Sequence, residues 1–236
     1  MSLPTRYAGW MARDLAVGPG LPMAVLTVLA ALLTSRLQVV GPVADADRAA
    51  CLVVLDWTAI VLTLLATGGL VSGDFAIGHQ RTLFAKPVSP PLYYLQRWLL
   101  GLVAVLVGAA VVAETIAVRF GGSLLGLAFV ARLALLYLVV GGLVFLLSTV
   151  TRRDWLAAAV LLAWQVALGW ARSMGFAQGP VGTVLHGVLP PVRLLGLSGP
   201  LPGGTELALA LGYGAALLLG ALAVLQWRPL ARGARE

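Results

Sequence analysis

Long apolar runs constrain this chain more than any other feature of its sequence. Six segments of 17 to 27 residues each contain at most two charged side chains. A membrane-spanning helix needs about 20 predominantly apolar residues. We therefore expect an all-α integral membrane protein in which six transmembrane helices form one domain over residues 1–236. The predicted spans are Leu21–Val40, Ala49–Val71, Arg97–Val118, Leu124–Val150, Trp155–Ala171 and Thr205–Trp227.

The composition excludes several other classes of protein. Hydrophobic residues make up 60% of the chain and charged residues 11%, against roughly 25% charged residues in a soluble domain. A soluble enzyme and a disordered chain are therefore excluded. Cys51 is the only cysteine, so neither an internal disulfide nor a disulfide-stapled fold is possible.

The basic residues predict an orientation in the membrane. The net charge is +7, and ten of the 16 basic residues fall on the side that holds both termini. Because cytoplasmic loops carry an excess of Lys and Arg, we expect a multi-pass protein of the plasma or inner membrane with both termini in the cytoplasm. No basic stretch alternates with aromatic residues, so a nucleic-acid partner is not expected.

Residues 1–17 have the pattern of an amphipathic helix. At 100° per residue, Tyr7, Trp10 and Met11 share one face, and the arginines lie on the other. We interpret this segment as a helix lying in the membrane interface, ended by Gly18-Pro19-Gly20. Asp14 lies on the apolar face and does not fit the pattern. The alternative is an ordinary solvated terminus.

The connection between the second and third spans, residues 72–96, is the most informative loop. Its roughly 25 residues are more than a plain connection needs. Asp74 suits the start of a short helix, because a carboxylate accepts hydrogen bonds from the free N–H groups there. Lys86-Pro87 would end that helix, and Pro90-Pro91 would form an extended turn before the third span. Tyr93 and Tyr94 are interpreted as part of an aromatic belt at the membrane interface.

The motif in this loop resembles the permeases of type-2 ABC transporters. The resemblance rests on an Asp-x-x-x-Gly motif, then Lys-Pro-Val-Ser, then a Tyr and a basic residue that opens a span, and it extends to the six-span plan of the whole chain. Two positions depart from the family pattern: His79 stands where Thr is usual, and Pro90 where Arg is common. The matching residues are Asp74, Gly78, Lys86, Pro87, Val88, Ser89, Tyr94 and Arg97.

The resemblance implies a function and partners. The loop would be a coupling helix that docks on cytoplasmic ABC ATPase subunits, and a second permease subunit, in a homo- or heterodimer, would complete an exporter. ATP and Mg²⁺ would be bound by the ATPase, and no cofactor or metal is expected in this chain. His79 is interpreted as a surface contact with the partner. The residues expected to contact the ATPase are Asp74, Phe75, Gly78, His79, Arg81, Leu83, Lys86 and Pro87.

Three charged residues lie inside predicted spans: Asp56, Glu114 and Arg132. Such residues normally face the interior of a bundle and pair with one another. Counted from the predicted helix ends, all three lie in the external third of the membrane, so we expect a polar cluster. The cluster either holds three helices together or lines a substrate route.

Residues 172–204, before the last span, are rich in Gly and Pro and contain two short apolar pieces, neither long enough to span. We interpret this segment as a re-entrant helical hairpin, which the permease family also has here. A flexible external loop is the alternative. Gly108, Gly141 and Gly142 would allow close helix packing, either at a subunit interface or within one chain.

The sequence contains no motif for catalysis. No phosphate-binding G-x-x-x-x-G-K-[ST] loop, G-x-S-x-G or H-E-x-x-H motif occurs, so we do not expect an enzyme. Besides the permease, two other functions remain open. One is a membrane scaffold or assembly protein without transport activity, and the other is a stand-alone secondary transporter.

Overall fold

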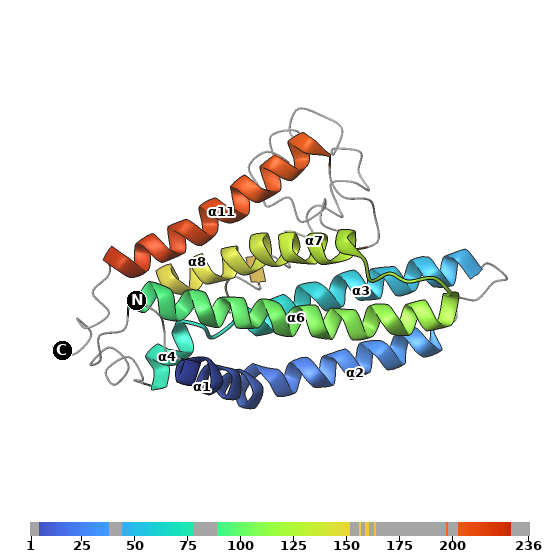
Figure 1. Cartoon of the computed structure of the whole chain (residues 1–236), viewed down its shortest axis with the longest axis horizontal. Coiled ribbons are helices and arrows are strands. Elements are labelled where there is room, and N and C mark those ends of the chain that lie inside the picture. Colours follow the sequence, from blue (N-terminus) through green and yellow to red (C-terminus); the bar gives the residue numbers. More distant parts are fainter. Residues whose placement is uncertain are drawn as a thin grey trace.

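The computed structural model describes residues 5–37, 44–77, 89–151 and 203–227, together with the single positions 156, 159, 160, 163 and 197. Within these ranges the chain is all-helical, with short turns and no strand (Figure 1). Five helical stretches of the described part are long and apolar enough to cross a membrane. They are Met11–Arg36, Asp45–Asp74, Pro90–Phe120, Leu127–Thr151 and Gly204–Trp227.

Four of these stretches correspond closely to predicted spans, and the one that begins at Met11 joins the first predicted span to the end of the N-terminal helix. The fifth predicted span, 155–171, and nearly all of the segment 172–204 lie outside the described residues. The elements in chain order are α1 (Thr5–Leu15), η1 (Ala16–Gly20), α2 (Leu21–Arg36), α3 (Ala44–Thr67), α4 (Ser72–Ile77), α6 (Pro90–Phe120), α7 (Leu127–Leu136), η2 (Tyr137–Gly141), α8 (Gly142–Thr151) and α11 (Gly204–Trp227).

The helices pack in two groups that share one core. Helices α2, α3 and α6 contact one another, while α8 and the turn η2 pack against α11, and η2 also contacts α3. Figure 1 shows α1, α4, the start of α6 and the ends of α8 and α11 at one end of the bundle. We name this the α4 end. The end of α2, the start of α3 and the end of α6 lie at the opposite end.

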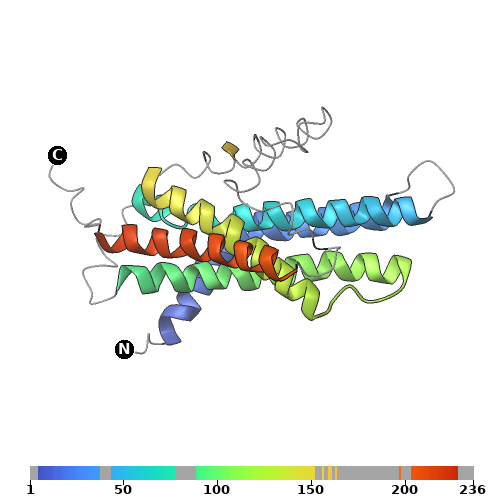
Figure 2. The ribbon, with the colours of Figure 1, turned by 90° about the horizontal axis from the view of Figure 1, so that it is seen from above.

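The N-terminal helix does not stop at Gly18-Pro19-Gly20 as predicted. A π-helical turn, η1, contains Pro19 and joins α1 to α2. Proline lacks the N–H that an α-helix requires, and the wider π turn accommodates it without ending the helix. Figure 2 shows α1 leaving the bundle at a steep angle to α2. Met11, on the predicted apolar face, is buried, so part of this face contacts protein.

Helix α6 starts earlier than predicted, because Pro90 and Pro91 occupy its first two positions instead of an extended turn. The first turn of a helix has no N–H bonds to lose, so proline is tolerated there. As a result Tyr93 and Tyr94 belong to the helix, and both are buried in the bundle. Their interpretation as an interfacial belt was therefore wrong.

Two glycines in the connection from α6 to α7 turn the chain back, so that α7 does not begin beside the last turn of α6. Gly121 and Gly122 have φ angles of +75° and +82°, a region that glycine adopts without strain. The two glycines reverse the chain, and residues 121–126 run back along the bundle before α7 starts (Figure 1). The first turns of α7 therefore lie nearer to the middle of the bundle than to the end opposite the α4 end.

Glycines that were predicted to allow close packing do so within this chain. A Cβ added at Gly108 would lie 2.9 Å from Thr27 Oγ1, and one at Gly142 would lie 3.3 Å from Leu217 Cβ. A Cβ added at Gly141 would lie 3.1 Å from Thr67 Cγ2 on α3 and 3.3 Å from Trp98 Nε1. These glycines therefore join helices of one chain.

Candidate functional site

The most connected polar site lies at the α4 end, around Arg97. One guanidinium nitrogen, Nη1, is 2.8 Å from Asp74 Oδ1, and Nη2 is 3.0 Å from Asp14 Oδ2. The same Nη1 also donates a hydrogen bond to the Leu70 carbonyl at 3.5 Å. We name these four residues the Arg97 cluster. It links α1, α4, the turn after α3, and α6.

Burial distinguishes the two carboxylates. The Arg97 side chain is 12% exposed and that of Asp74 is 6% exposed, whereas that of Asp14 is 42% exposed. Tyr93 contacts the Arg97 side chain and Tyr94 contacts that of Asp74. The two rings pack edge to face with their centroids 5.1 Å apart. The Asp74–Arg97 pair is therefore shielded from water by aromatic side chains, and the Asp14–Arg97 pair is partly solvated.

The local sequence explains this geometry. Asp74 lies in the first turn of α4, where a carboxylate is favoured by the unpaired N–H groups of the helix. Arg97 lies two turns into α6, on the side that faces α4. Asp14, which did not fit the apolar face of the predicted interfacial helix, contacts this arginine. Its position therefore reflects an ion pair within the protein.

The remaining residues of the predicted partner site are only partly described. Phe75 belongs to α4, and nothing is described of its side chain. The positions from 78 to 88 lie outside the described residues. Gly78, His79, Arg81, Leu83, Lys86 and Pro87 are among them.

The structure brings together two of the three predicted intramembrane charges. Asp56 on α3 and Arg132 on α7 lie close enough for their charges to interact. Asp56 also accepts a hydrogen bond from the backbone N–H of Leu197, with a distance of 2.7 Å between Oδ1 and N. Glu114, in contrast, is exposed on the outer surface of α6. Because α3 begins at Ala44, Asp56 lies near the middle of its helix.

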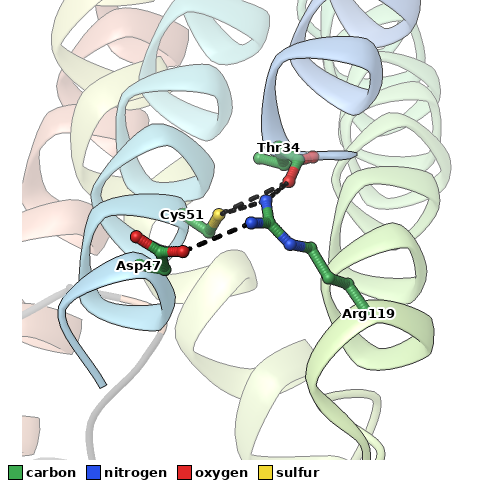
Figure 3. Close-up of polar contacts among 4 residues, drawn as sticks. All are labelled: Thr34, Asp47, Cys51 and Arg119. Carbon is green, nitrogen blue, oxygen red and sulfur yellow. Dashed lines mark hydrogen bonds and ion pairs between the residues drawn. The ribbon is translucent and has the colours of Figure 1, made fainter. Parts of the chain in front are cut away.

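A second arginine cluster lies at the opposite end (Figure 3). Arg119 Nη1 donates to the Thr34 carbonyl at 2.6 Å, and Nη2 is 3.4 Å from Asp47 Oδ2. The Cys51 thiol also donates to the Thr34 carbonyl, at 3.6 Å. We name these four residues the Arg119 cluster. It joins the last turn of α2 to α3 and α6.

Helix α6 therefore carries an arginine at each end of its buried length. Arg97 and Arg119 are separated by 22 positions, which corresponds to about 33 Å at 1.5 Å per residue. The hydrocarbon core of a bilayer is about 30 Å thick. The two clusters are thus spaced to lie at the two faces of a membrane, with the apolar part of α6 between them.

Some contacts were not found from the sequence. The Tyr137 hydroxyl donates to the Trp98 carbonyl at 2.7 Å, and these two rings lie 4.7 Å apart. Tyr137 begins the π turn η2, which no periodicity revealed. The Arg119 cluster was also missed, and the only signal was an arginine at the end of a span.

The described residues contain no group of three or more His, Cys, Asp or Glu side chains arranged to hold a metal ion. The two clusters have the chemistry of structural ion pairs, in which carboxylates and carbonyls surround a guanidinium. They hold helix ends together. Comparison with models of known protein families gives no match, and comparison with curated protein sequences gives no match either.

Proposed function

We propose that this chain is the membrane permease subunit of an ATP-driven transporter of the type-2 ABC class, which exports its substrate from the cytoplasm. The observation that carries the proposal is the position of α4. This short helix directly follows a long apolar helix, and the buried Asp74–Arg97 pair fixes it to the start of the next one. In this proposal the α4 end faces the cytoplasm, where residues 72–96 contact the ATPase.

The Arg97 cluster suits the transfer of motion from such a partner. A 2.8 Å ion pair shielded from water holds α4 against α6, and the bond to Asp14 adds α1 to the same unit. A force on α4 is therefore passed directly to α6. Helix α6 continues to the opposite end, where Arg119 contacts α2 and α3.

The proposal includes two kinds of partner. ATP and Mg²⁺ would be held by a separate cytoplasmic ATPase, and a second permease subunit would complete the pathway. Phe75, Gly78, His79, Arg81, Leu83, Lys86 and Pro87 are the residues proposed to contact the ATPase.

The experiment is to purify the full chain from its native membrane in mild detergent and to identify any bound ATPase. Arg81→Ala and Gly78→Leu should then uncouple ATP hydrolysis from the permease without changing the yield of the folded chain. Arg48→Ala is the matched control, because Arg48 is an exposed arginine at the opposite end.

If no ATPase co-purifies, or if a bound ATPase stays fully coupled in the Arg81 and Gly78 variants, the proposal is wrong. The first result would favour a membrane scaffold or a stand-alone secondary transporter. Reconstitution of the chain without ATP, with or without an ion gradient, would separate these two.

A further inference from the structure

A hydrogen bond inside the bundle joins residues that are far apart in the sequence. The Asp56 carboxylate on α3 accepts the backbone N–H of Leu197 at 2.7 Å. Leu197 lies in a turn, and it is 6% exposed and belongs to the hydrophobic core. Asp56 is 12 residues from the first residue of α3 and 11 from the last, so it lies about 17 Å from either helix end.

A turn at this depth has a specific requirement. Outside a helix, backbone N–H groups are not regularly paired along the chain, and a membrane offers no water to replace a missing partner. Such backbone is tolerated only where protein satisfies it. A carboxylate is a strong acceptor for this purpose, because a hydrogen bond to a charged group is about twice as strong as a neutral one. The charge of Arg132 also interacts with that of Asp56.

Three threonines on the same helix bond only locally. The hydroxyls of Thr58, Thr63 and Thr67 each donate to the carbonyl four residues earlier. Such bonds satisfy the hydroxyl locally and require no other segment. Asp56 instead contacts a residue 141 positions later in the chain.

We propose that Asp56 is a positioning residue that holds Leu197 inside the helix bundle through its backbone N–H. Loss of the carboxylate releases Leu197 toward water while the five long helices stay assembled. This inference does not depend on the proposed function.

The test measures the exposure of position 197 to a membrane-impermeant maleimide. Cys51→Ser first removes the only cysteine, and Leu197→Cys then places a single thiol in the full chain, reconstituted in lipid nanodiscs. With Asp56 present, labelling should be slow. Asp56→Ala should accelerate it about tenfold or more, since a charge-assisted hydrogen bond contributes about that factor. Arg132→Gln should accelerate it less.

Ala210→Cys in the same Cys51→Ser background is the control, because Ala210 is fully buried in α11. Its labelling should be unchanged by Asp56→Ala. The proposal is overturned if position 197 shows no acceleration, or if both positions accelerate equally, since the bundle as a whole would then have loosened.

Asp56→Asn keeps the test valid if the alanine variant does not fold. Its amide oxygen still accepts a hydrogen bond but carries no charge, so labelling at position 197 should rise severalfold. An unchanged rate in this variant would also overturn the proposal.

Discussion

Asp74 and Asp14 both pair with Arg97, but removing one or the other carboxylate should change the stability by very different amounts. Asp74 and Asp14 contact the same guanidinium at 2.8 and 3.0 Å, but their side chains are 6% and 42% exposed. Breaking a buried ion pair costs about 3–5 kcal/mol, because a desolvated charge is left behind. An exposed pair is worth about 0–1 kcal/mol.

We expect Asp74→Ala to lower the free energy of unfolding by about 3 kcal/mol, the lower end of that range, because Arg97 keeps Asp14 as a second partner. Asp14→Ala should cost less than about 1 kcal/mol. Arg97→Ala should cost at least as much as Asp74→Ala, since it leaves the buried Asp74 carboxylate without its main cation.

The free energy of unfolding can be measured by SDS titration in mixed micelles, with helix content followed by circular dichroism. Asp74→Asn and Asp14→Asn separate the loss of charge from the loss of packing. In an Arg97→Ala background, Asp74→Ala should cost much less than in the wild type, because the ion pair is already lost. If Asp74→Ala and Asp14→Ala lower the free energy of unfolding of the wild type by the same amount, this account of the cluster is refuted.

Other positions give further predictions in the same unfolding assay. Gly101→Ala should lower the free energy of unfolding by about 1–3 kcal/mol through overpacking, because the added Cβ would lie 2.5 Å from the Tyr137 hydroxyl. The loss should be smaller in a Tyr137→Phe background, and an unchanged loss would contradict the contact. Arg119→Ala should cost about 1.5–3 kcal/mol, because it removes a charged donor from the Thr34 carbonyl; a cost below 0.5 kcal/mol, the size typical of surface substitutions, would mean that the contact is not stabilising. Glu114→Gln should change stability by less than about 0.5 kcal/mol, since the side chain is exposed, and a loss above about 1 kcal/mol would reveal a partner for it.

The sequence predicted the helices well where apolar composition decides their ends. The last span was expected at residues 205–227, and α11 runs over Gly204–Trp227. The prediction of helix bounds failed where a helix extends beyond its apolar part. Helix α3 begins at Ala44, with Asp45 and Asp47 in its first turn, where acidic residues favour a helix but lower the hydropathy of the window.

The sites were less predictable than the helices. The role of Asp74 near a helix start followed from local chemistry, but its pairing with Arg97 depends on how α4 packs against α6. The contact between Arg119 and Thr34 joins residues 85 positions apart and uses a backbone carbonyl, which has no sequence signal at all. Glu114 shows the converse. Its depth in a span suggested a partner, but the rotation of α6 turns the side chain outward.

The two arginine clusters also affect how the protein responds to bilayer thickness. A single helix usually adapts to a thinner membrane by tilting. Helix α6 is tied to its neighbours at both Arg97 and Arg119, so it cannot tilt without breaking ion pairs or carrying the other helices with it. Hydrophobic mismatch would therefore be borne by the lipid or by a tilt of the whole bundle. The chain should be most stable in bilayers whose hydrocarbon core is close to the spacing of the two arginines.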